Sequence, residues 1–216
     1  MRIEKIVELK ADRKHKLVVF EGGVRFFCPS ATLKEVGLNE GDDADPDELK
    51  ARAGEEERRL AEEIAVRKLS FAPRSEKEIR ASIFAAHISA DAALDAVEKM
   101  ERYNYLDDER FARDYITYRG KKLGRKRLEY ELTAVKGVDR DLVRGLIEEL
   151  TSDDEELKKA KDAAEKFCSA RVMSSKNAGA RLLNHLSYRG FDAKTVFSVK
   201  NEMFKRGNDT DNDAEE

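Results

Sequence analysis

The hydrophobic pattern of the chain changes near residue 45. Before it, two apolar runs rich in Val and Phe, Leu17–Phe20 and Val24–Cys28, flank the dipeptide Gly22-Gly23. This arrangement is typical of a β-hairpin with a two-residue turn, because glycine tolerates the positive φ that such a turn requires. The first part of the chain is therefore predicted to form antiparallel strands.

A two-residue turn would decide which residues pair across the hairpin. In that register Val19 faces Phe26 and Val18 faces Phe27. Residues 3–9 place apolar side chains on one side and predict a third strand. We therefore expect a small three-stranded meander, followed by a short helix.

Internal repetition is the main feature of the rest of the chain. Three times an apolar residue precedes a residue that commonly caps a helix N-terminus, with a period of about 50 residues. Gly137 and Gly190 precede the last two junctions and suit the left-handed end of the helix before. The three junctions are Ile88-Ser89, Val138-Asp139 and Phe191-Asp192.

Each repeat is expected to contain three helices. The predicted fold is mostly α, with three tandem three-helix repeats that form a curved elongated body, preceded by a small N-terminal three-stranded antiparallel β domain. Leu106 is expected to pack on Phe111 at the start of the second repeat. The predicted boundaries are 1–45 for the β domain, 46–106, 107–151 and 152–206 for the repeats, and 207–216 for a disordered acidic tail. The first helices of the repeats are expected at about 46–69, 108–119 and 153–170.

Composition narrows the class of protein. The 216 residues include 40% charged and 7% aromatic residues and no Trp, which favours long exposed helices over an all-β sandwich or a large catalytic cleft. The 42 basic and 45 acidic residues balance to a net charge of −3, which argues against a surface that is basic throughout. No run approaches the ~18 consecutive apolar residues of a membrane span, and we expect a cytoplasmic protein.

Candidate catalytic and metal-binding residues are few. Cys28 and Cys168 are far apart in the sequence, which indicates buried thiols rather than a disulfide or a zinc site. His15, His87 and His185 have no neighbours at metal-ligand spacing, and we expect structural roles for them. The chain carries no nucleophile elbow, phosphate-binding loop or dinucleotide motif. The sequence therefore predicts a protein that is not an enzyme and needs no metal or cofactor.

Tyrosines gather at the junction between the first and second repeats. They could stack on nucleic-acid bases, or they could pack between the repeats. We favour packing. These residues are Tyr103, Tyr105, Tyr115 and Tyr118.

A basic run stands above the background of mixed charges. Residues 119–127 contain six cations and no acid. Cations near a helix C-terminus need no partner, but the last three of the run fall at a predicted helix N-terminus, where the helix dipole disfavours them. We therefore favour contact with phosphates or an acidic protein surface over a role in solubility alone. The candidate contact residues for such a partner are Arg119, Lys121, Lys122, Arg125, Lys126 and Arg127.

The segment Asn104–Tyr115, followed by this basic run, resembles the RecX family of recombination regulators. Pro73–Ile79 is similar to that family's first repeat, and Tyr188–Asp192 is similar to its third. The N-terminal meander, with Glu35–Leu38, resembles an extra domain that some members carry. The resemblance covers nearly the whole chain.

This resemblance implies a non-enzymatic protein that binds RecA and its filament on DNA. Such a protein would curb filament growth and the ATPase, strand-exchange and coprotease activities of RecA, with roles in DNA repair and the SOS response. The expected partners are the RecA filament and, as a further candidate, single- or double-stranded DNA, with no membrane and with the chain as a monomer. Two alternatives stay open, which are a helical nucleic-acid-binding module that competes for DNA and a plain scaffold for unrelated partners.

Overall fold

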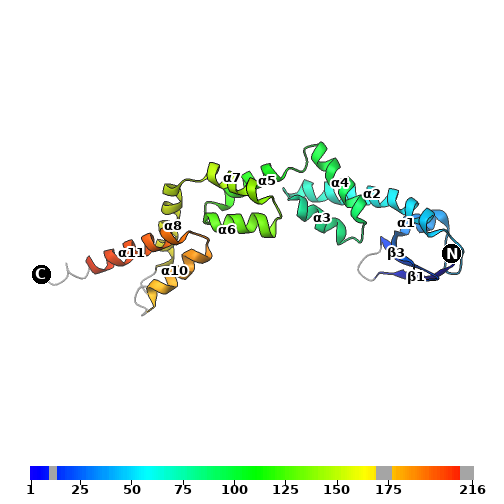
Figure 1. The fold of residues 1–216 in the computed structure, drawn as a ribbon, viewed down its shortest axis with the longest axis horizontal. Coiled ribbons are helices and arrows are strands. Elements are labelled where there is room, and N and C mark those ends of the chain that lie inside the picture. The colour runs from blue at the N-terminus through cyan, green and yellow to red at the C-terminus, as the bar shows by residue number, and fades with distance from the viewer. Residues whose placement is uncertain (10–13, 169–176, 210–216) are drawn as a thin grey trace. The chain divides into compact units, whose positions relative to one another are not determined.

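The structure is a computed structural model that describes residues 1–9, 14–168 and 177–209 (Figure 1). These residues fall into two units, one ending at Asp107 and the other beginning at Asp108. The expected fold class is confirmed, because the described chain is mostly helical and begins with a three-stranded antiparallel sheet. The boundaries of the repeats stay predictions, and residues 210–216 of the expected tail lie outside the described residues.

The sheet of the first unit contains β1 (Ile3–Glu8), β2 (His15–Phe20) and β3 (Arg25–Pro29) in that order. Helix α1 (Ser30–Val36) and the first turns of α2 (Pro46–Phe71) pack against the sheet. Together they bury one hydrophobic core that consists of Ile3, Val18, Phe20, Cys28, Leu33, Leu49 and Ala53.

The hairpin register predicted from the sequence is wrong by one residue. Val18 pairs with Phe26 instead of Phe27. The Phe20 N–H donates to the Val24 carbonyl at 2.8 Å, so the turn has three residues, and both of its glycines have positive φ. Three-residue turns with a left-handed glycine are a common alternative to the two-residue type. The observed register places Phe26 and Cys28 on the same face as Val18 and Phe20, and all four side chains contribute to the core of the sheet.

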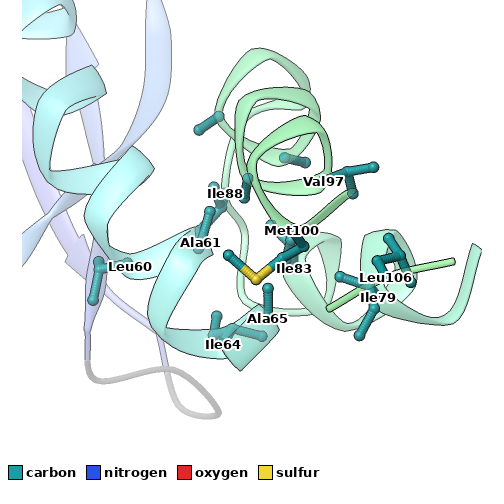
Figure 2. Close-up of a cluster of buried hydrophobic side chains, with 13 residues drawn as sticks. Leu60, Ala61, Ile64, Ala65, Ile79, Ile83, Ile88, Val97, Met100 and Leu106 are labelled. Carbon is teal, nitrogen blue, oxygen red and sulfur yellow. The ribbon is translucent and has the colours of Figure 1, made fainter. Parts of the chain in front are cut away.

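Helix α2 continues beyond the sheet and packs with α3 (Glu76–Phe84) and α4 (Ala90–Arg102) (Figure 1). Helix α3 begins with a capping box formed by Ser75 and Glu78, which satisfies backbone N–H groups at the helix start. Figure 2 shows Ile83 and Met100 pointing towards Ala61 on α2. This three-helix cluster has its own buried core, separate from that of the sheet.

The second unit contains two further clusters of helices. The first is formed by α5 (Asp108–Arg119), α6 (Arg125–Tyr130), the π-helix η1 (Glu131–Val135) and α7 (Arg140–Leu150). The second is formed by α8 (Asp153–Phe167), α10 (Ala178–Tyr188) and α11 (Ala193–Asp209). Helix α8 ends before the expected residue 170, and residues 169–176 lie outside the described chain. Helix α11 includes the first three residues of the expected tail.

The predicted junctions between helices are present. Gly137 and Gly190 have φ of +80° and +86°, as a left-handed helix end requires. The first repeat has no glycine there, and His87 adopts the same left-handed conformation with φ of +59°. The helices that follow begin at the predicted N-caps, Ser89, Asp139 and Asp192. The side chain of each accepts a hydrogen bond from a backbone N–H group in the first turn.

The packing predicted for Leu106 on Phe111 is wrong. Leu106 is 3% exposed and belongs to the core of the first three-helix cluster, whereas Phe111 belongs to the next cluster. The cause is a chain reversal after α4, where Asn104 has a φ of +56°. The N–H of Leu106 donates back to the Met100 carbonyl at 3.2 Å, and this bond turns the side chain into the first core.

Candidate functional site

Residues 119–127, which we call the basic segment, join α5 to α6 within the second unit. Helix α5 ends at Gly120, whose N–H donates to the Ile116 carbonyl at 2.8 Å. A Cβ on Gly120 would collide with that carbonyl, so only glycine fits this close turn. Leu123 is partly buried against the core that α5, α6, η1 and α7 share, and Gly124 forms the N-cap of α6. The loop is therefore anchored at both ends.

The N-terminus of α6 is satisfied by backbone carbonyls from the end of α10. The Gly124 N–H donates to the Arg189 carbonyl at 2.8 Å, and the Lys126 N–H donates to the Gly190 carbonyl at 3.1 Å. The first N–H groups of a helix have no partner inside the helix. The negative end of α10 supplies the missing acceptors for α6.

Arg125 connects the basic segment to the start of α8. Its backbone N–H donates to the carboxylate of Glu156 at 2.9 Å, and Glu156 is 1% exposed. Its guanidinium donates from Nε to the Thr151 hydroxyl at 2.7 Å and from Nη1 to the Asp153 carboxylate at 2.6 Å. Arg125, one of the candidate contact residues, therefore has a structural role. Its position at a helix N-terminus suggested an external partner, but its donors already have acceptors within the chain.

Glu131 organises two more of the candidate cations. It is the first residue of the π-helix and is 8% exposed. Its carboxylate accepts the Tyr115 hydroxyl at 2.5 Å, Arg127 Nε at 2.8 Å and Arg119 Nη2 at 3.4 Å. Burial alone would raise the pKa of Glu131, but the hydrogen bonds from Tyr115 and Arg127 and the charge of Arg119 lower it below its ordinary value.

The guanidinium of Arg127 also contacts two tyrosine rings. It lies 5.7 Å from the ring centre of Tyr130 and 5.3 Å from that of Tyr188. Both tyrosines are exposed. A guanidinium within about 6 Å of an aromatic face is attracted to the ring electrons. The surface next to the basic segment therefore presents two accessible aromatic rings.

The remaining three candidate cations are Lys121, Lys122 and Lys126, which we call the lysine group. All three are exposed, and within the described ranges none forms an ion pair or a side-chain hydrogen bond, although the charge of Lys126 helps to lower the pKa of Asp192. All six cations were candidates from the sequence, which shows none of their contacts. The structure separates three cations with internal contacts from three that are available to an external partner.

The packing between repeats that was expected for the clustered tyrosines would join the two units and stays a prediction. Tyr103, Tyr105 and Tyr118 are exposed by 59%, 62% and 75%. Only Tyr115 is half-buried, because its hydroxyl reaches Glu131 and its ring lies 5.9 Å from Phe111. Tyr130 was not a sequence candidate, and it is 55% exposed.

Histidines and cysteines contribute to packing. His87 stacks on Phe27 with ring centres 4.7 Å apart, and His185 stacks on Phe167 at 4.2 Å. Burial and the charge of Arg189 lower the pKa of His185. Among the residues that the structure describes, no group of three or more His, Cys, Asp or Glu side chains is arranged to hold a metal ion. No helix in this part of the chain is long and apolar enough to cross a membrane.

Comparison with known proteins relates the basic segment to one family. The family model described as "RecX, second three-helix domain" matches residues 107–145, which include the whole basic segment. The regulatory protein RecX of Caldanaerobacter subterraneus subsp. tengcongensis is 24% identical over 202 residues, which cover 93% of this chain and 99% of that protein. Residues 107–145 thus match the second three-helix domain of RecX, and the chain as a whole is similar to regulatory protein RecX.

Other RecX proteins show the same likeness. The RecX of Lactobacillus delbrueckii subsp. bulgaricus is 30% identical over 131 residues, which cover 60% of this chain and 48% of that protein. A crystal structure of regulatory protein RecX has a TM-score of 0.60 at 19% identity and covers 93% of this chain and 98% of its own. RecX from Lactobacillus salivarius has a TM-score of 0.58 at 21% identity, covering 68% and 96%. These two structures share the fold of this chain.

Proposed function

We propose that this chain regulates the RecA recombinase by binding RecA and its filament on DNA. In this role it limits filament growth and the ATPase, strand-exchange and coprotease activities of RecA. Similarity to proteins that are named regulatory protein RecX supports the proposal. The active species is a cytoplasmic monomer that acts by binding, without a cofactor or a catalytic step.

The observation that carries the proposal is the lysine group. Lys121 and Lys122 lie in the loop between α5 and α6, and Lys126 lies in the first turn of α6, which Arg125 holds in place. Charged side chains without internal partners favour encounter with a surface of opposite charge, and a rigid backbone lowers the entropy lost on binding. An acidic face of a RecA filament, or the phosphates it carries, has the matching chemistry.

A second candidate function is direct binding of nucleic acid in competition with RecA. The rings of Tyr130 and Tyr188 favour it, because exposed aromatic rings beside cations are typical of surfaces on which unpaired bases stack. Binding through phosphates would weaken steeply with salt, by ~0.7 log unit per log unit of salt for each single-strand contact. Salt therefore discriminates between the two functions.

The deciding experiment measures ATP hydrolysis by RecA on single-stranded DNA with the full chain added at substoichiometric ratios, at two salt concentrations. Inhibition well below one molecule per RecA that persists at the higher salt supports the regulator. A loss of inhibition with salt, or a need to saturate the DNA, supports competition for DNA. If the chain has no effect on ATP hydrolysis at any ratio, both functions are contradicted. A scaffold for unrelated partners is then the alternative that stays open.

A charge-matched pair of triple variants tests the assignment of the lysine group. We expect Lys121→Ala, Lys122→Ala and Lys126→Ala together to weaken inhibition by about tenfold or more, as the loss of several charge contacts implies. The control removes three other exposed cations of the second unit, Arg140, Lys166 and Lys194. Equal effects of the two triple variants would contradict the assignment, since both change the net charge equally.

A further inference from the structure

The two edges of the N-terminal sheet differ in whether other parts of the chain cover them. The outer edge of β1 is covered, because the Ile3 N–H donates to the Asp42 carbonyl and the Ile3 carbonyl accepts the Gly41 N–H, both at 2.9 Å. Further along, the Ile6 N–H donates to the Glu40 carboxylate at 2.7 Å. These bonds block strand addition at β1, which is how proteins commonly protect a sheet edge.

The outer edge of β3 has no such cover. The Phe20 N–H donates to the Val24 carbonyl, and the bonds of an antiparallel ladder alternate from that point. The backbone N–H and C=O groups of Arg25 and Phe27 therefore point away from β2. Neither residue has a backbone hydrogen bond on that side to any group in the described ranges. Two donors and two acceptors are thus open to an extended chain.

A cleft of about 810 Å³ lies along this edge. Phe26 and Phe27 point to opposite faces of β3 and both line it, so the cleft follows the edge of β3, and it extends over the face that Phe27 shares with Leu17 of β2. The opposite wall comes from α2 and from the junction between α3 and α4. Gly54 on α2 has no atom within 4 Å of where a Cβ would lie, so this wall is open. The whole cleft lies within the first unit.

The lining of the cleft indicates the chemistry of its ligand. Its apolar surface comes from Phe27, Phe84 and Ile88, and Phe84 is 47% exposed although it is a large aromatic residue. Arg25 and Lys50 line the same cleft, are exposed and have no ion-pair partner among the described residues. An apolar side chain next to an acidic one would match these groups.

The acidic residues of the cleft do not neutralise these two cations. Glu57 is 6% exposed and accepts the Ser89 N–H at 3.2 Å. Asp91 lies in the first turn of α4, where a carboxylate complements the helix dipole. Arg58, the third cation of the lining, donates to Asp95 at 2.8 Å. Arg25 and Lys50 are therefore the charges available to a ligand.

We propose that this cleft binds an extended peptide segment of a partner protein, which adds to the edge of β3 as a fourth strand. The backbone of the segment bonds to Arg25 and Phe27, its apolar side chain enters the cleft beside Phe84, and its acidic side chain pairs with Arg25 and Lys50. Strand addition obtains affinity from the backbone and selectivity from alternate side chains. The proposal does not depend on RecA.

The test begins with a random decapeptide display library selected against the full chain. We expect enrichment of sequences in which an acidic residue adjoins an apolar one. An enriched peptide is then synthesised, and amide hydrogen exchange is followed by NMR. The Arg25 and Phe27 amides should exchange about tenfold more slowly when the peptide is bound, as new hydrogen bonds imply, while the Val18 amide, already in the ladder, keeps its rate.

Two pairs of variants locate the contacts. Arg25→Pro removes the free N–H, which an edge position tolerates, whereas Arg25→Gln removes only the charge. Phe84→Ser removes the apolar contact, and Phe71→Ser is its control, because Phe71 is 89% exposed and lies outside the cleft. We expect Arg25→Pro and Phe84→Ser to weaken the peptide about tenfold or more, Arg25→Gln to weaken it less, and Phe71→Ser to leave it unchanged.

Several results would overturn the proposal. They are the absence of any enriched peptide, enrichment of basic peptides, binding that leaves the exchange of Arg25 and Phe27 unchanged, and equal effects of Phe84→Ser and Phe71→Ser. Circular dichroism of each variant accompanies the binding measurement. If Arg25→Pro is misfolded, the exchange experiment on the unmodified chain decides the question alone.

Discussion

The backbone of Gly124 lies directly against the backbone of Gly190. A Cβ on Gly124 would fall on the Gly190 carbonyl, and a Cβ on Gly190 would fall on the backbone of Arg127. Gly124 has a φ of −80°, so its conformation suits any residue and only the lack of space requires glycine. The contact brings the carbonyls at the end of α10 within hydrogen-bond distance of α6.

This contact predicts opposite effects for two Gly→Ala substitutions in the second unit. Gly124→Ala should destabilise it by about 1–3 kcal/mol, because the added carbon must push two backbones apart. Gly145→Ala should stabilise it by about 0.5–1 kcal/mol, because Gly145 lies inside α7 with open space around it. Urea unfolding followed by circular dichroism measures both. Stabilisation by Gly124→Ala would show that the junction is looser than described.

Arg125 is predicted to contribute to the stability of the second unit. Arg125→Met should destabilise the second unit by about 1–3 kcal/mol, since the Thr151 hydroxyl and carbonyl lose charge-assisted hydrogen bonds. The ion pair to Asp153 adds little, because that carboxylate is 91% exposed. Asp153→Asn, measured in the same unfolding assay, is the control and should change stability by less than about 0.5 kcal/mol.

Glu131 predicts part of the acid sensitivity of the protein. Its pKa is lowered in the folded state, so the carboxylate stabilises the fold fully above its unfolded pKa, near 4.5, and this contribution is lost as the pH falls through the lower folded value. Glu131→Gln should lower stability at pH 7 and reduce the further loss between pH 5 and pH 3. Urea midpoints at several pH values measure this, with Glu148→Gln as an exposed control on α7. Parallel pH profiles for the wild type and Glu131→Gln would contradict the role of the hydrogen bonds.

Cys28 is predicted to resist alkylation in the folded protein. Burial and the nearby charge of Glu57 raise its pKa to about 12, so very little thiolate forms at pH 8. Cys168 is half-buried and should react first. Intact mass spectrometry after iodoacetamide treatment should show one adduct on the native protein and two in urea. Two adducts at equal rates without denaturant would mean that the sheet opens readily.

Two substitutions of His87 are predicted to differ in their effect on stability. Its φ of +59° disfavours any residue with a Cβ, so His87→Gly should be more stable than His87→Ala by about 1–2 kcal/mol. Both variants lose the contact with Phe27, which cancels in the comparison. Thermal unfolding measures the difference. Equal stability of the two variants would indicate that the left-handed conformation is absent.

The helices could be predicted from the sequence because their signals are local. Ser89, Asp139 and Asp192 mark helix starts by residue type alone, and Gly137 and Gly190 mark helix ends. His87 has the same conformation without a residue type that signals it. The hairpin register was wrong because a pair of glycines permits turns of two or three residues, and only the packing of the strands decides between them.

The candidate site could be located from the sequence but not resolved into roles. A run of six cations is visible in the sequence, whereas the partners of Arg125 and Arg127 come from residues far along the chain or from the π-helix. Only tertiary contacts separate these residues from the lysine group. The open edge of β3 could not be predicted for a similar reason. Only the tertiary structure shows that residues 40–42 cover the edge of β1 and not that of β3.

The bond from Gly124 to Arg189 also has a consequence for the order in which the protein is made. Arg189 lies 65 positions after Gly124, so the ribosome releases the start of α6 well before the carbonyl that completes it. A nascent chain that ends before α10 keeps the first turn of α6 without its acceptors. The basic segment therefore reaches its final form only late in translation, after most of the C-terminal cluster has emerged.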